Sequence, residues 1–416
     1  MPEVRVKKLL IAVVVVVVLL VAGYFLAAGI IETQAKSVAR SLKAAGQAMS
    51  MDDIAPWFEA GSRAAASALE SASALADKSD LQRLAFYDTV GWKTDPTGMK
   101  QFAAGKGDLF SRLMRISAMG PANFGVDFRA GMNCRLPKVL PSFPGFRMLL
   151  SIEARTLADA GQYDSALAVL GASFRLANSL AEPLLIHKLV EVVGLDTAFA
   201  LTGRFAPHAG SAAVERLATI LGQFDPTPKL APALQSEGVM VREALALAQT
   251  FYPFAEESPD AALTTPAIGF LPLREYALLR QLQAQKEQLA IVELPWYEAN
   301  VRLDRSEQTM GGTGLLAKVA RYGVANLRPF YSRMERYTAM RDAALLGLKA
   351  VEFRRRAGRV PERLDEFAPD APVDRFSGQP YLYRVEPAGL LVYGVGSDGN
   401  DDGGDARKDV VFRVRL

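Results

Sequence analysis

The sequence predicts a mainly α-helical protein with an N-terminal transmembrane helix, a multi-helix body and a small antiparallel β-sheet at the C-terminus. Three observations support this fold class. An uninterrupted apolar run occupies residues 9–31, and helix-forming segments rich in alanine and leucine fill most of the chain after it. Beyond residue 380, the hydrophobic period changes from that of a helix to that of a strand. We therefore expect helices followed by a C-terminal α+β module.

The apolar run, LLIAVVVVVVLLVAGYFLAAGII, has no charged side chain over residues 9–31. At about 1.5 Å of rise per residue, such a helix crosses a hydrocarbon core of roughly 30 Å. Signal peptides normally have apolar cores of about 7–15 residues, which favours an uncleaved signal-anchor over a cleaved or lipid-linked export signal or a buried soluble helix. Three basic residues precede the run and Glu32 follows it. This charge bias predicts a cytoplasmic tail, residues 1–8, an inner-membrane span and a periplasmic bulk.

Composition excludes several classes of function. The net charge is +3 over 416 residues, and the basic residues are spread along the chain, so we expect no nucleic-acid partner. Cys134 is the only cysteine, which rules out an intrachain disulfide. A zinc site would need nearly all of Cys134, His187 and His208, whose spacings match no ligand pattern. His187 lies in the apolar helical stretch PLLIHKLVEVV, where a structural role is favoured over a catalytic one.

The segments between the membrane span and the C-terminal module differ in composition. Residues 32–90 are rich in alanine and serine and predict a helical stalk leaving the membrane. Residues 91–146 hold many glycines and prolines and predict an irregular connection with one short helix, 108–119. Residues 147–332 return to the helical pattern and form the predicted body. Its later helices are expected at 229–257, 273–293 and 296–310.

One part of the body, ARTLADAGQYDSALAVLGASFRLANSLAEP, resembles a tetratricopeptide-type helical hairpin with Gly161 at the turn. That consensus spans about 34 residues, and stability usually takes at least about three stacked repeats. The sequence contains one convincing copy. An ordinary α-hairpin is therefore favoured over a repeat surface that binds an extended peptide.

The last long helix has clear boundaries. Three arginines occupy its last turn, where cations favour the negative end of the helix dipole. Gly358 supplies a left-handed cap, and Pro361 prevents continuation. Its apolar residues recur at spacings of three and four, which places them on one face: Tyr337, Met340, Ala344, Leu348 and Val351.

Three short segments after this helix predict antiparallel strands at 380–385, 389–395 and 409–416. They are β-branched or aromatic and are bounded by Gly, Pro and Asp. The composition changes abruptly from that of the helices before them. We therefore assign a helix-plus-sheet module to residues 333–416.

The loop between the last two strands, SDGNDDGGDARKD, fits a calcium-binding pattern when Asp398 is taken as position 1, with Asp in place of the final Glu. Alternate oxygen ligands on a tight loop can converge on a hard cation, and glycine permits the turn. The alternative is a solvated acidic hairpin loop, relieved by Arg407 and Lys408. Strands flank the loop, so an EF-hand is not expected. The predicted ligands are Asp398, Asn400, Asp402, Asp409 and the carbonyl of Gly404, with Asp401 and Asp405 adding charge or substituting as ligands.

Three pieces of this module, GRVPERLDEF, DRFSGQPYLYR and GLLVYGVGSDGNDDGGDARKDVVF, resemble the C-terminal part of the major pseudopilin of type II secretion systems. The resemblance implies that the loop binds calcium and that the ion stabilises the small sheet. It covers a minority of the chain. The N-terminus lacks the glutamate and the Gly-Phe cleavage point of a pseudopilin, so the resemblance implies the module and its ion rather than assembly into a pilus. The whole chain resembles membrane-anchored bacterial envelope proteins that end in such a module.

Two functions are consistent with these observations. The first is a non-enzymatic, single-pass envelope protein whose helical body binds a protein partner and whose C-terminal module is stabilised by calcium, with a role in secretion or envelope assembly. The second is an exported, membrane-anchored hydrolase with a carboxylate active site among the helices, drawn from Glu182, Glu191 and Asp196. A deep pocket with two facing acids would favour the hydrolase, and a shallow concave surface would favour the binding protein.

Overall fold

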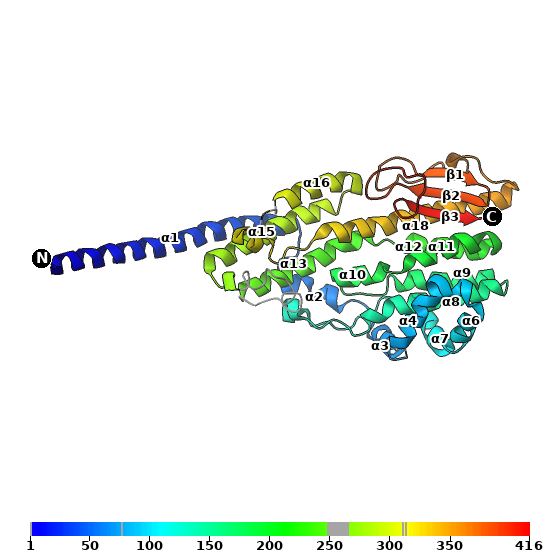
Figure 1. Ribbon diagram of the computed structural model, residues 1–416, viewed down its shortest axis with the longest axis horizontal. Helices are drawn as coiled ribbons and strands as arrows, with labels where there is room; N and C mark the ends of the chain where they lie inside the picture. The colour runs from blue at the N-terminus through cyan, green and yellow to red at the C-terminus, as the bar shows by residue number, and fades with distance from the viewer. Residues whose placement is uncertain (1, 76–77, 248–265, 310–311, 313) are drawn as a thin grey trace.

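The computed structural model describes residues 2–75, 78–247, 266–309, 312 and 314–416. Side chains are described from residue 13 onward in these ranges, except at 78, 79, 132 and 309. The chain is mainly helical with one three-stranded antiparallel sheet at its C-terminus, which confirms the predicted fold class (Figure 1). The first half contains α1 (Pro2–Ala44), α2 (Met51–Glu59), α3 (Arg63–Ser73), α4 (Lys78–Phe86), η1 (Tyr87–Gly91), α5 (Trp92–Thr94), α6 (Pro96–Ala104), α7 (Gly107–Ile116), η2 (Phe128–Asn133), η3 (Leu140–Ser142), α8 (Phe143–Asp159), α9 (Tyr163–Leu176), α10 (Leu185–Val192) and α11 (Leu195–Phe205).

The second half continues with helices and ends in the sheet. Its elements are η4 (Ala206–His208), α12 (Ser211–Gln223), η5 (Thr227–Lys229), α13 (Leu230–Ala246), α15 (Leu271–Ile291), α16 (Trp296–Thr309), α17 (Leu315–Arg321), α18 (Leu327–Ala357), η6 (Leu364–Glu366), β1 (Leu382–Glu386), β2 (Gly389–Gly394) and β3 (Val410–Arg415). The predicted helix 229–257 is therefore α13, and its last ten residues lie outside the described ones.

Helix α1 extends out of the body as one continuous rod (Figure 1). Within the described residues, Val13–Ala44 is the one helix segment long and apolar enough to cross a membrane. The body does not cover the apolar side chains in the first part of α1: Leu20 is 69% exposed and Leu26 is 67% exposed. From Ala28 onward one face is buried, because α15 packs along it. The helix therefore has the length, composition and exposure expected of a membrane span.

The predicted stalk, residues 32–90, does not stand apart from the body. Leu42, Ile54 and Leu69 are fully or nearly fully buried, and α2, α3 and α4 pack against later helices. Short helices with an apolar stripe gain stability only when that stripe is covered. The prediction of a separate stalk is therefore wrong, and these helices are part of the body.

The segment 91–146 is also more regular than predicted, because α6 and α7 occupy most of residues 96–116. Asp95 caps α6: its carboxylate accepts a hydrogen bond from the Gly98 amide at 2.9 Å, and Pro96 occupies the first helical position. Proline at that position starts a helix rather than breaking one. Only 117–142 is irregular, with two short 3₁₀ turns.

Helices α8 and α9 form the predicted α-hairpin. Gly161 adopts φ +74° at the turn, where the left-handed backbone favours glycine. Helix α9 then packs on α11 and α12, so the hairpin lies at the centre of the helical body.

The last helix and the three strands confirm their predictions. Helix α18 ends at Gly358, which has φ +67° and donates its amide hydrogen to the carbonyl of Arg354. The strand order is β1-β2-β3, with antiparallel pairing such as Leu390 opposite Val414. The sheet packs on α18 at Gly347, where an added Cβ would lie 2.4 Å from the Phe412 ring. Glycine is required there because the strand approaches the helix so closely.

The C-terminal module is not separable from the body. One continuous hydrophobic core extends from Ala35 to Val414 and includes residues of α18, of the helices around it and of the sheet. Helix α18 contacts α10, α12 and α16 as well as the sheet, and β3 also packs on α11. The predicted boundary at 333 falls inside α18, because this helix buries residues toward both the body and the sheet. The sheet lies at the end of the body opposite to the free part of α1 (Figure 1).

Candidate functional site

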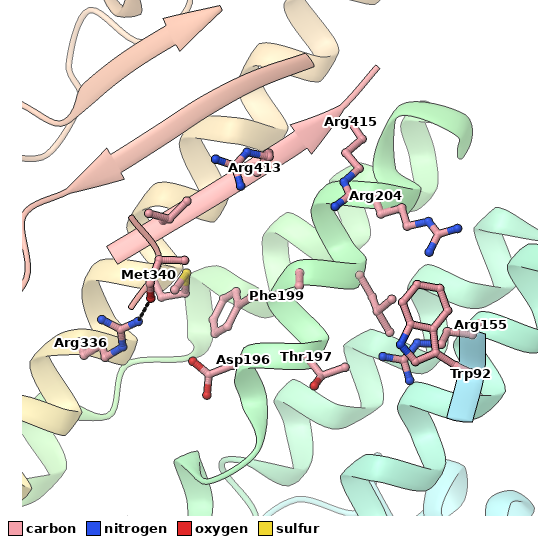
Figure 2. Close-up of a pocket in the computed structure, with 14 residues that line it drawn as sticks. Trp92, Arg155, Asp196, Thr197, Phe199, Arg204, Arg336, Met340, Arg413 and Arg415 are labelled. Carbon is pink, nitrogen blue, oxygen red and sulfur yellow. Dashed lines mark hydrogen bonds between the residues drawn. The ribbon is translucent and has the colours of Figure 1, made fainter. Parts of the chain in front are cut away.

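A cleft of about 390 Å³ lies between α11, α18 and β3, at the end of the body that carries the sheet (Figure 2). Trp92 of α5 and Arg155 of α8 close one end of the cleft. Five arginines from four elements line it: Arg155, Arg204, Arg336, Arg413 and Arg415. Asp196, at the start of α11, is the one carboxylate among the lining residues. The lining is therefore strongly basic.

Three of these arginines are held by the protein itself. Arg155 pairs with Asp88 at 3.0 Å, and Arg413 pairs with Glu386 at 2.8 Å. Arg336 donates to two backbone carbonyls of the acidic loop, each at 3.3 Å. Burial lowers the pKa of the Arg155 guanidinium, although Asp88 opposes this effect. These contacts shape the wall of the cleft and partly neutralise it.

Arg204 and Arg415 have no carboxylate within ion-pair distance in the described part of the chain. The guanidinium of Arg204 lies 5.4 Å from the ring centre of Trp92, which orients it by a cation–π contact. Figure 2 shows Arg204 and Arg415 at the same end of the cleft. Two cations without acidic partners, on a wall with one carboxylate, make this end suited to an anion.

The single carboxylate of the cleft is engaged by a tyrosine. The hydroxyl of Tyr337 donates to Asp196 at 2.6 Å. Burial, with the neighbouring Asp196 charge, raises the pKa of Tyr337, so it remains a donor at physiological pH. Asp196 therefore joins α11 to α18, and among the described residues it forms no ion pair with Arg204 or Arg415.

Two further hollows share lining residues with the cleft and extend it into a groove. One, of about 530 Å³, shares Asp196 and Arg336 with the cleft and adds Arg333. The other, of about 270 Å³, shares Arg155 and Arg204 and ends at His208. Arg333 also lacks a carboxylate partner among the described residues. The cleft therefore connects the two other hollows, which share no lining residue with each other, and all three are lined by arginines.

The acidic loop lies beside this groove, and the structure places each predicted ligand. Asp409 is fully buried, and its carboxylate accepts hydrogen bonds from the amides of Gly404 at 2.7 Å and Asp402 at 3.4 Å. Asp402 pairs with Lys408 at 2.7 Å. Asp398 accepts from the Asn400 amide at 3.1 Å. The loop is folded around its own carboxylates.

The two remaining acids of the loop are also held locally. Asp401 accepts from the Gly403 amide at 2.8 Å, and Asp405 pairs with Arg407, which lowers the pKa of Asp405 to about 2. Among the described residues, no three acidic, histidine or cysteine side chains gather closely enough to hold a metal. One oxygen, Oδ2 of Asp402, is buried without a hydrogen-bond partner. The oxygen donors suit calcium, but binding would require Lys408 to release Asp402.

The carboxylates considered for a hydrolase do not face each other across a pocket. Glu182 is buried and accepts from the amides of Phe124 at 2.5 Å and Gly125 at 3.1 Å. Glu191 is buried and pairs with Lys188 at 3.0 Å. A fourth hollow, of about 210 Å³ between α13 and α15, is lined by Glu237 alone among the acids. Each of these four hollows is lined by no more than one carboxylate.

The single cysteine and the two histidines lie apart from the acidic loop. Cys134 is half-buried, and burial raises the pKa of its thiol. His187 is fully buried, and His208 packs on Tyr163 with 4.9 Å between ring centres.

Comparisons with protein-family models, with curated proteins and with solved structures found no match. The fold and the site themselves define the chain as a mainly helical protein with, in its described part, one helix long and apolar enough to cross a membrane, and with an arginine-lined cleft between its body and its sheet.

Proposed function

We propose that this chain is a single-pass envelope protein that binds an acidic segment of a protein partner in the arginine-lined cleft. The observation that carries the proposal is the pair Arg204 and Arg415, which line the cleft without acidic partners in the described structure. Guanidinium groups bind carboxylates through paired hydrogen bonds, and such bonds are stronger than neutral ones. An acidic side chain placed between the two guanidinium groups would offset their positive charge.

The shape of the groove favours an extended chain over a small anion. Three hollows join through shared residues, and unpaired arginines occur in more than one of them. Successive acidic residues of an extended peptide would meet successive arginines. The cleft is lined by α11 and β3, which lie at the end of the body opposite to the free part of α1, away from the membrane that α1 would cross (Figure 1). This position favours a partner in the envelope over a lipid headgroup.

The membrane topology is part of the same proposal. The basic residues before the apolar run and Glu32 after it favour a cytoplasmic N-terminus and a periplasmic body. A role in secretion or envelope assembly rests on the resemblance of the C-terminal module to pseudopilins.

Calcium in the acidic loop is a further part of the proposal. Asp398, Asn400, Asp402, Asp409 and the carbonyl of Gly404 would hold the ion. The partnerless oxygen of Asp402 supports this assignment, and the ion pair of Asp402 with Lys408 opposes it. Calcium would neutralise the loop and stabilise the sheet that it joins.

The binding proposal is tested with a fluorescein-labelled peptide of six glutamates, titrated with the full chain in detergent micelles and followed by fluorescence anisotropy. We expect saturable binding that weakens as salt is added, and no binding of the matching glutamine peptide. The double variant Arg204→Gln/Arg415→Gln should bind at least about tenfold more weakly, because two charge-assisted contacts are lost.

The matched control is Arg302→Gln/Arg356→Gln, which removes two exposed arginines that line neither the cleft nor the hollows joined to it and leaves the same net charge. Equal weakening in both double variants would mean that net charge, rather than the cleft, drives binding. Unchanged binding in Arg204→Gln/Arg415→Gln would contradict the proposal.

A further inference from the structure

The end of the body from which α1 leaves carries four exposed apolar side chains, which we call the apolar foot. They come from three separate elements: Leu247 follows α13, Phe270 precedes α15, and Leu315 and Leu316 open α17. Leu247 is 59% exposed, Phe270 58%, Leu315 46% and Leu316 58%. Exposed apolar residues gathered at one end of a protein indicate an interaction surface.

A small core behind the foot shows that these elements converge. Leu245 of α13, Ile268 before α15, Ala277 of α15 and Val319 of α17 belong to one buried cluster. Leu315 and Leu316 precede Val319 by one helical turn, and Leu247 and Phe270 each follow a member of the cluster by two residues. The foot is therefore the outer side of one packed unit.

A hydrogen bond fixes the depth of this unit along α1. The amide of Leu271, the first residue of α15, donates to the hydroxyl of Tyr24 at 2.9 Å. A hydrocarbon core of about 30 Å takes about 20 helical residues, which from Leu9 extends to about Ala28. If the core ended at Tyr24, the apolar segment would be only about 22 Å long. The start of α15 therefore lies roughly one helical turn inside the apolar boundary.

The backbone at the start of α15 is suited to that depth. The first amides of a helix have no partner within the helix and usually bind water or a capping side chain. Here Leu271 donates to Tyr24, Pro272 has no amide hydrogen, and the amides of Leu273 and Arg274 both donate to the carbonyl of Phe270, at 3.1 and 2.9 Å. No amide in this turn needs water, which is the condition for backbone in contact with lipid.

From these observations we propose that the apolar foot inserts into the lipid surface around α1, in the membrane leaflet that faces the body. Phe270 and Leu316 would lie among the acyl chains, and Arg274, one turn after Phe270, would reach the headgroup level. The inference rests on the proposed membrane anchoring by α1. It adds that the body sits partly in the leaflet instead of on a stalk above it.

Single-cysteine labelling of the full chain tests the foot. In a Cys134→Ser background, which removes the only native cysteine, four variants place one cysteine at Leu20, Phe270, Leu316 or Val373. Each is labelled with an environment-sensitive fluorophore and reconstituted in vesicles of phosphatidylcholine and phosphatidylglycerol. Doxyl-labelled phosphatidylcholine then quenches the fluorophores that contact acyl chains. Val373 is the matched control, because it is an apolar residue that is 51% exposed near the sheet.

We expect strong quenching at position 20, quenching of at least about half that extent at 270 and 316, and none at 373. Quenching at position 20 with none at 270 and 316 would contradict insertion of the apolar foot while supporting membrane anchoring by α1. No quenching at position 20 would contradict membrane anchoring by α1, and with it the insertion of the apolar foot. All four positions are exposed, so each label is carried without disturbing the core.

Discussion

Gly203 of α11 lies directly against the backbone carbonyl oxygen of Arg413 on β3, where an added Cβ would stand 2.2 Å from that oxygen. In an antiparallel pair, hydrogen-bonded and non-hydrogen-bonded residue pairs alternate. Leu416 donates its amide to the carbonyl of Ala388, so the pair of Arg413 with Leu391, three residues along, is a non-hydrogen-bonded one. The carbonyl of Arg413 therefore points away from β2. Helix α11 therefore covers the outer edge of the sheet. A covered edge cannot pair with a strand of another chain.

Replacing Gly203 with alanine should force α11 and β3 apart. We expect the free energy of unfolding to fall by about 1–3 kcal/mol, as in other overpacked sites. The measurement is thermal or chemical denaturation of the full chain in detergent. Gly222→Ala in α12 is the control, because an added Cβ there meets no atom within 4 Å and should leave stability equal or slightly higher. Equal stability of both variants would show that the contact at Gly203 is not tight.

The fully buried carboxylate of Glu335 depends on Arg375. The guanidinium contacts it through two hydrogen bonds, at 2.5 and 2.8 Å. Arg375→Gln should destabilise the fold by about 3–5 kcal/mol, because a buried charge loses its partner. The double variant Glu335→Gln/Arg375→Gln should recover much of that loss. Denaturation of the wild type and all three variants forms a double-mutant cycle, and additive losses would contradict a coupled pair.

His187 should make the fold sensitive to acid. It is fully buried, neither ring nitrogen has a hydrogen-bond partner, and Nδ1 lies 3.7 Å from the Glu182 carboxylate. Burial, aided by the neighbouring Lys188, lowers the pKa of His187 from 6.5 to about 3. The unfolded chain therefore binds the proton first as the pH falls below about 6.5, and stability is lost from there toward pH 3.

His187→Leu replaces the buried imidazole with an apolar side chain and removes this titration. We expect the variant to lose less stability than the wild type between pH 6.5 and 4.5, by up to about 1.4 kcal/mol for each pH unit. Melting temperatures measured over this window give the comparison. Identical slopes for wild type and variant would show that other groups cause the acid sensitivity.

Calcium should raise the melting temperature of the full chain, compared with the same protein in chelator, if the acidic loop binds it. Asp398→Ala should abolish the rise. The control Asp370→Ala removes an exposed aspartate outside the loop and should leave the rise unchanged. A melting curve that is the same in calcium and in chelator would contradict calcium binding, and the segment would then be an acidic loop held by Lys408 and Arg407.

Local sequence determined the elements whose signals lie within a few residues. Three local patterns each predict a structure from residues adjacent in the sequence: the apolar run 9–31, the Gly358 cap of α18 and the alternation in the three strands. The structure has each of them where it is predicted. The many glycines and prolines of 91–146 predict an irregular connection where the structure has helix α6, although Asp95 before Pro96 is a capping residue. That signal was present in the sequence.

The tertiary structure alone decided which distant residues meet. Arg155 and Arg415 are separated by most of the chain, and no spacing in the sequence indicates that both would line one cleft. The same holds for Glu335 with Arg375, and for Tyr24 with Leu271. Packing also joined the predicted stalk and module to one core, because apolar faces are buried wherever another face is available. Helix and strand patterns come from neighbours along the chain, whereas a site comes from neighbours in space.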